Sequence, residues 1–132
     1  MIYSFLQNGD SAVTVQFKNE ISEEVNRRVT GLCNRIEAKH INGIIELVPT
    51  FASLTVFYDC TIISSKKLKK KIKSLINGGE CDVKSTAKVW NIPVCYDDEF
   101  ALDMKNVCSH TALEREEVIK LHTSKPYLIY ML

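Results

Sequence analysis

The sequence predicts an α+β fold in which two helices pack on a mainly antiparallel sheet. Two observations predict it: short strand-like runs occur in pairs around turn residues, and an amphipathic helical segment follows each pair. The chain has 132 residues, a length that can bury a core without disulfides. We expect an N-terminal α+β domain over residues 1–86 and a second segment over residues 87–132.

The stretch 43–59 is predicted to form a hairpin at the centre of the sheet. It contains two short runs rich in β-branched and aromatic residues, with Pro49 between them. In the second run Leu54, Val56 and Tyr58 alternate with other residues, so they share one face of a strand. We expect that face to cover the core.

A first pair of strands is predicted over residues 2–6 and 12–17. The residues between them include Asn8, Gly9 and Asp10, which are typical of a tight turn. Aspartate beside glycine commonly hydrogen-bonds its own backbone. A turn role for Asp10 is therefore favoured over a role as a ligand.

A first amphipathic helix is predicted to follow Ser22, a residue type that caps helix N-termini well. Glu23 and Glu24 then suit the positive end of the helix dipole. The apolar positions recur every three or four residues, at Val25, Val29, Leu32 and Ile36. We interpret this stripe as facing the core.

A second amphipathic helix is predicted after Ser64 and Ser65, ending at the sequence 77–79 (Asn-Gly-Gly). Its apolar stripe is Leu68, Ile72, Leu75 and Ile76. The polar side carries six lysines, at positions 66, 67, 69, 70, 71 and 73. No aromatic residues lie between them for base stacking, so a solvated helix face is favoured and no nucleic-acid partner is predicted. With a further strand predicted over residues 88–96, the order β, β, α, β, β, α, β indicates an α+β sandwich of the ferredoxin-like kind.

The composition indicates a cytoplasmic protein. The net charge is +1, and the five cysteines are widely spaced without a Cys-x-x-Cys pair. No apolar run is long enough to cross a membrane, and no signal-peptide pattern begins the chain. The three histidines show no metal-ligand spacing, so no metal site is predicted.

The second segment is predicted to contain two strands. Residues 80–86 are expected to form a loop or linker, and 88–96 a strand in which Pro93 favours an edge or a bulge. Cys95 is expected to be a small buried thiol in that strand. The unbroken apolar run 127–132 is expected to be a buried strand.

Two helices are predicted between these strands. A short helix is expected over residues 103–109 and a longer one over 112–121. Thr111 and Glu114 have the spacing of a capping box for the second helix.

The motifs along the chain resemble those of a bacterial family called allophanate hydrolase subunit 1, which includes the 5-oxoprolinase subunit designated B and the kinase inhibitor KipI. The matching residues of the hairpin are Gly43, Ile44, Glu46, Val48, Pro49, Phe51, Ser53, Leu54, Tyr58 and Asp59. Further matches are Gly9, Asp10, Ala12, Asn26, residues 92–96, residues 117–119, Leu121 and His122. Cys60, Asp97 and Leu102 depart from the family pattern.

The resemblance implies a non-catalytic or incomplete subunit of a bacterial ATP-dependent amide or lactam hydrolase complex. It implies a second hydrolase subunit as partner, and ATP used by the complex but not bound by this chain alone. It also implies that residues 87–132 are the opening of a truncated cyclophilin-like domain. The alternative is a KipI-like inhibitor of a sensor histidine kinase.

No catalytic residues are assigned from the sequence. The candidates for family-motif or interface roles are Asp10, Asn26, Glu46, Pro49, Ser53, Tyr58, Asp59, His122 and Tyr127. For His122, a position at a helix end favours capping over catalysis, and pairing with Cys95 is disfavoured. The C-terminal run 127–132 is also expected to pair between copies and form a homo-oligomer.

Overall fold

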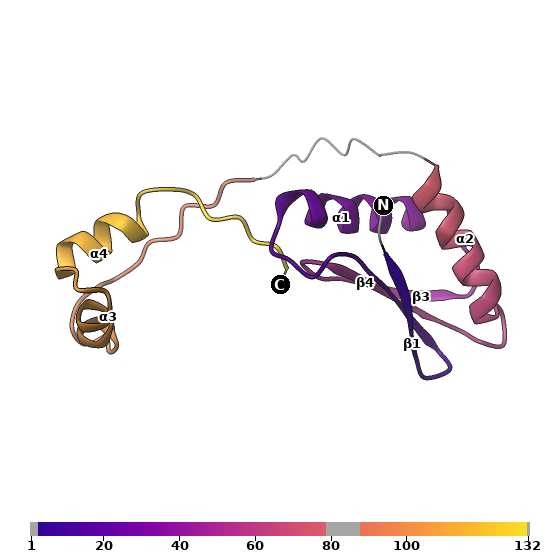
Figure 1. The fold of residues 1–132 in the computed structure, drawn as a ribbon, viewed down its shortest axis with the longest axis horizontal. Coiled ribbons are helices and arrows are strands. Elements are labelled where there is room, and N and C mark those ends of the chain that lie inside the picture. The colour runs from indigo at the N-terminus through magenta and orange to yellow at the C-terminus, as the bar shows by residue number, and fades with distance from the viewer. Residues whose placement is uncertain (1–2, 79–87, 132) are drawn as a thin grey trace. The chain divides into compact units, whose positions relative to one another are not determined.

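The computed structural model describes residues 3–78 and 88–131. They fall into two compact units. The first comprises the described residues up to 78 together with 129–131, and the second comprises residues 88–128. The predicted linker over residues 80–86 lies outside the described residues. Figure 1 shows the elements of both units.

A four-stranded antiparallel sheet forms the first unit, with its strands in the order β1-β2-β4-β3. The strands are β1 (Ser4–Asn8), β2 (Ala12–Gln16), β3 (Ile44–Pro49) and β4 (Ser53–Tyr58). Both predicted hairpins are present. The prediction that the second hairpin forms the sheet's centre is only half right, because β4 lies inside the sheet and β3 is an edge strand. Proline has no backbone N–H to donate to a neighbouring strand. Pro49 is therefore tolerated at the end of β3, because β3 is an edge strand.

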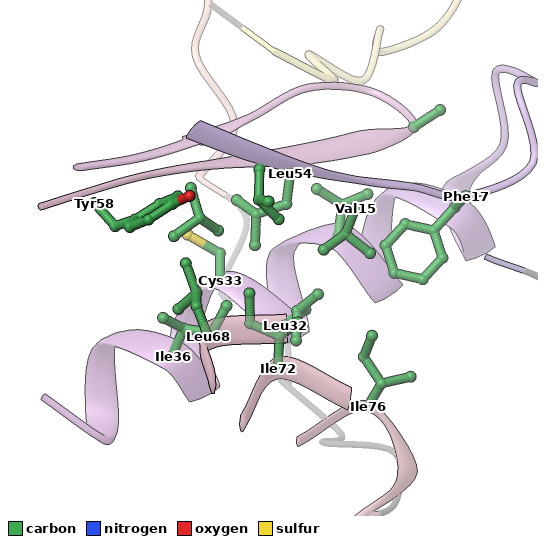
Figure 2. Packing of buried hydrophobic residues seen from close by; sticks show 14 of the residues in the cluster. Val15, Phe17, Leu32, Cys33, Ile36, Leu54, Tyr58, Leu68, Ile72 and Ile76 are labelled. Atoms are coloured by element: carbon green, nitrogen blue, oxygen red, sulfur yellow. The ribbon is translucent and has the colours of Figure 1, made fainter. Parts of the chain in front are cut away.

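Two helices cover one face of the sheet, as predicted (Figure 1). They are α1 (Glu23–Ala38) and α2 (Ser65–Asn77), with Ser22 and Ser64 at their N-cap positions. The core lies between sheet and helices, where Leu54, Val56 and Tyr58 are at most 1% exposed. Figure 2 shows Val15 of β2 on the same side of the sheet as Leu54, with the core side chains of α1 and α2, such as Leu32 and Ile72, packed against them. The helical and strand periodicities therefore identified the core faces correctly.

The start of β3 and the end of β4 are joined at a close backbone contact. The Asp59 N–H donates to the Gly43 carbonyl at 2.8 Å. Gly43 has a φ of +96°, and a Cβ there would lie 2.7 Å from Cγ2 of Ile63. Only glycine fits this position without strain, because the backbone is left-handed and the space is already filled.

The second unit contains two short helices and extended segments. The helices are α3 (Met104–Thr111) and α4 (Arg115–His122). The predicted capping box is wrong, because α3 extends to Thr111, whose hydroxyl donates to the Val107 carbonyl. The Glu114 N–H instead bonds the Glu117 carboxylate at 3.0 Å, which makes Glu114 the cap of α4.

Neither predicted strand of the second segment forms. Residues 88–96 and 126–131 carry no strand among the described residues, and Leu132 lies outside them. Trp90, Ile92 and Tyr127 are 66%, 73% and 59% exposed. Cys95 is exposed as well, contrary to the prediction of a buried thiol. An apolar run becomes a strand only where a neighbouring strand completes its hydrogen bonds, and the described residues supply none.

None of the helices in the described residues has the length and apolar character that crossing a bilayer requires.

Replacing Gly43 with alanine should destabilise the first unit by more than about 2 kcal/mol, because the left-handed backbone costs roughly 1–2 kcal/mol and Ile63 must also move. Gly9→Ala is the matched control, since Gly9 has a φ of +60° but nothing within 4 Å of an added Cβ. Chemical denaturation measures both variants. Equal losses would show that the contact with Ile63 contributes nothing.

Candidate functional site

Thr50 and Ser53 form the turn of the β3–β4 hairpin. The Thr50 hydroxyl accepts hydrogen bonds from the N–H groups of Ser53 and Ala52, at 3.0 and 3.4 Å. It also lies 2.9 Å from the Ser53 hydroxyl. Glu46 is exposed on β3, opposite Phe57. The turn therefore occupies Ser53, whereas the Glu46 carboxylate is available to another molecule.

Asp59 closes the far end of the same hairpin. Its Oδ1 accepts hydrogen bonds from the Thr61 N–H at 2.8 Å and the Thr61 hydroxyl at 2.6 Å. These bonds, led by the one from the hydroxyl, hold the pKa of the Asp59 carboxyl below its ordinary value. The Asp59 carboxylate, one of the hairpin residues that match the family pattern, therefore holds a local turn.

Tyr58 belongs to a polar network that the sequence did not reveal. Its hydroxyl accepts a hydrogen bond from Nε2 of Gln7 at 3.2 Å, and Gln7 Oε1 accepts one from the Ser65 hydroxyl at 2.6 Å. The same Nε2 donates to the Gly9 carbonyl at 2.8 Å. Gln7 thus links β1, β4 and the start of α2. Asp10, in the adjacent turn, lies exposed.

Asn26 connects α1 to the C-terminal residues of the first unit. Its Nδ2 donates to the Tyr130 carbonyl at 3.0 Å. The hydroxyl of Thr30 donates to the Asn26 carbonyl at 2.8 Å, within the helix. Asn26 is therefore placed to hold the segment 129–131 against α1.

A cluster of ring side chains organises the second unit. The Tyr96 hydroxyl lies 2.5 Å from Nδ1 of His122, and the two rings meet edge to face. The Tyr127 ring lies 5.8 Å from that of His122. His122 is the last residue of α4, as predicted, and it contacts both tyrosines. The structure thus brings together two of the predicted candidates, His122 and Tyr127.

Arg115 supports this cluster, and nothing in the sequence singled it out. Its guanidinium donates to the Tyr96 carbonyl and pairs with the Asp98 carboxylate. The bond from Arg115, together with its charge, holds the pKa of the Asp98 carboxyl below its ordinary value. An acidic loop followed by a first-turn arginine was the available signal, but sequence alone did not show that they meet.

The arrangement favours binding over bond-breaking chemistry. Cys95 Sγ lies 3.4 Å from an Asp97 carboxylate oxygen, so the thiol contacts an anion rather than His122. A cysteine nucleophile is activated by an adjacent base such as an imidazole, and the Cys95 thiol contacts a carboxylate instead. Among residues 3–78 and 88–131, no group of three or more metal-ligating side chains converges.

A shallow depression of about 340 Å³ lies beside α3, lined by Phe100, Leu102, Met104, Val107 and Val118 with Ala101 and Asp103. It is mainly apolar, with one carboxylate. A small-molecule site normally has several converging polar groups, so this hollow better suits an apolar side chain of another protein.

Thr61→Val should raise the pKa of the Asp59 carboxyl toward its ordinary value, because the hydroxyl bond is the largest cause of the lowered value. A lowered folded-state pKa stabilises the fold above the unfolded-state pKa, and that contribution is lost as pH falls through the folded-state value. Asp59→Asn should therefore flatten the loss of stability between about pH 5 and pH 2. Carboxyl titration by NMR measures the first effect and denaturation at several pH values the second. An unchanged Asp59 titration in Thr61→Val would contradict the assignment.

The comparisons with known proteins cover nearly the whole chain. The family described as carboxyltransferase domain, subdomain C and D, matches residues 3–132. The 5-oxoprolinase subunit designated B of Bacillus subtilis (strain 168) is 38% identical over 141 residues, covering 98% of this chain and 58% of the relative. The chain therefore spans little more than half the length of that curated relative.

Two solved structures are similar in fold as well as in sequence. PH0987 from Pyrococcus horikoshii is 33% identical with a TM-score of 0.55, covering 92% of this chain and 56% of that one. The protein TTHA0988 is 30% identical with a TM-score of 0.70, covering 90% of this chain and 22% of that one. The resemblance to the family that includes this 5-oxoprolinase subunit is confirmed, and the chain belongs to the carboxyltransferase domain family, subdomain C and D.

Proposed function

We propose that the chain is a non-catalytic or incomplete subunit of a bacterial, cytoplasmic, ATP-dependent amide or lactam hydrolase complex. The observation that carries this proposal is the 38% identity with a 5-oxoprolinase subunit across 98% of the chain. The partner is the second hydrolase subunit of the same complex. ATP is used by the complex, where it drives the opening of a lactam such as 5-oxoproline.

A scaffolding role is supported by what the motif residues do. Ser53 and Asp59 are used in turns, and Tyr58 is buried and bonded to Gln7. Side chains whose hydrogen bonds hold the fold in this way are poor candidates for a nucleophile, a base or a phosphate ligand. The chain's contribution to the reaction would then be to position other parts of the complex.

An interface role is supported by the exposed apolar side chains of the second unit. Leu102, Ile92 and Trp90 are 81%, 73% and 66% exposed. Large apolar side chains left exposed to water favour association with another molecule. A partner that docks on the second unit would bury them.

The alternative of a KipI-like inhibitor of a sensor histidine kinase stays a prediction. The two functions differ in what the chain should bind. A hydrolase component should associate with a second subunit, whereas an inhibitor should bind a kinase and lower its autophosphorylation.

The purified chain should show no turnover of 5-oxoproline or allophanate, with or without ATP, because its motif residues are committed to turns. Release of glutamate and of ADP are the measurements. The full-length Bacillus subtilis relative, assayed with the other subunits of its complex, is the positive control. Sustained turnover by the isolated chain would contradict the scaffolding role.

The purified chain should also self-associate, because residues 88–96 and 127–131 leave large apolar side chains in water. Burial of such a segment is worth several kcal/mol at roughly 25 cal/mol per Å². Light scattering measures the mass of the particle. The protein concentration should be tens of micromolar, which is about the dissociation constant of a modest interface. Ile92→Lys should shift the mass toward the monomer, whereas Lys105→Gln, at an exposed position of α3, should not. A monomeric parent chain would show this prediction to be wrong.

A further inference from the structure

The outward face of α2 carries a row of lysines that the proposed function does not use. Leu68, Ile72 and Ile76 are at most 4% exposed and face the core (Figure 2). At 3.6 residues per turn, positions 66, 70 and 73 fall on the opposite side of the helix, in one row about 10 Å long. Lysines 67, 69 and 71 flank the row.

No carboxylate in the described part of the first unit forms an ion pair with this face. The ion pairs of the described residues involve Lys18, Arg28 and Arg115, and none of the six lysines of α2 takes part in one. The first turn of α2 contains no acidic residue. Within the described residues, these six charges therefore have no carboxylate partner.

The lysines also repel their own helix. Lys66 and Lys67 lie in the first turn, beside the positive end of the helix dipole. Three pairs of like charges are spaced four residues apart, which disfavours a helix: 66 with 70, 67 with 71, and 69 with 73. A row of carboxylates on another molecule would relieve both effects at once. The α2 lysines differ from Arg35 of α1, whose guanidinium donates a hydrogen bond to the Leu75 carbonyl of α2 at 2.7 Å.

The structure favours the carboxylates of a protein over the phosphates of a membrane or a nucleic acid as the negative groups that pair with these lysines. The apolar side of α2 is buried in the core, so the helix has nothing left to insert into a lipid surface. No aromatic side chain lies among the lysines for base stacking. The net charge of the chain is +1, so without the six lysines of α2 the rest of the chain carries −5, whereas binding along a nucleic-acid backbone calls for a wider basic surface.

We propose that the outward face of α2 is a docking surface for an acidic segment of a partner protein. Carboxylates of that segment pair with Lys66, Lys70 and Lys73. The proposal goes beyond the proposed function, because it holds whether the partner belongs to a hydrolase complex or not.

The probe is a synthetic helical peptide with glutamates at three positions spaced by four and three residues, labelled for fluorescence anisotropy. A triple variant, Lys66→Gln with Lys70→Gln and Lys73→Gln, removes the row. The matched control is Lys105→Gln with Lys120→Gln and Lys125→Gln, which removes the same charge from exposed positions elsewhere. At low salt the first variant should bind the peptide about tenfold more weakly than the parent, and the control should bind nearly as well.

Three outcomes would overturn the proposal. The parent chain does not bind the peptide, or both variants lose affinity equally, or duplex DNA or phosphatidylglycerol vesicles bind the parent more tightly than the peptide with the same dependence on the row.

Thermal unfolding checks the premise that the lysines repel one another within α2. The row variant should unfold at the same or a higher temperature than the parent, with the difference shrinking as salt increases. A lower unfolding temperature counts against the proposal.

Discussion

The fold of the first unit depends on the burial of β4. Its helix-facing side chains Leu54, Val56 and Tyr58 are almost fully buried, and β2 and β3 bond both of its edges. A strand with neighbours on both sides cannot slip by one residue, because a slip would turn these side chains away from the core. Both of its ends must therefore be fixed. The Thr50 turn fixes the first, and the bond between Asp59 and Gly43 fixes the second.

This constraint gives a structural role to the hairpin residues that match the family pattern. Gly43 is needed because Ile63 fills the space beside it, and Asp59 because its carboxylate orders the turn that leads toward α2. Ser53 completes the Thr50 turn. A motif of this kind preserves a geometry. Its presence shows a shared fold, and the proteins that carry it are free to differ in what they bind or which reaction they serve.

The sequence patterns correctly predicted the elements that depend on neighbouring residues alone, which are the helices and hairpins of the first unit. The two helices follow from apolar periodicity, and the hairpins follow from Asn8, Gly9 and the residues around Pro49. The edge position of β3 was missed, because strand order depends on contacts between distant segments. The link from Gln7 to Tyr58 and Ser65, and the pairing of Arg115 with Asp98, were missed for the same reason. Each joins polar groups that no spacing in the sequence relates.

Two runs that were both predicted to be strands have opposite outcomes in the two units. In β4 it gives a buried strand, whereas in residues 88–96 it leaves side chains such as Trp90 in water, because no strand of the described residues bonds that backbone. The surfaces left for partners consequently differ in physics. Contacts of the second unit would gain free energy from apolar area and change little with salt. Contacts of the α2 lysines would be weakened by salt and would act mainly on the rate and selectivity of association. One chain with both kinds of surface can select a partner by charge and retain it by area.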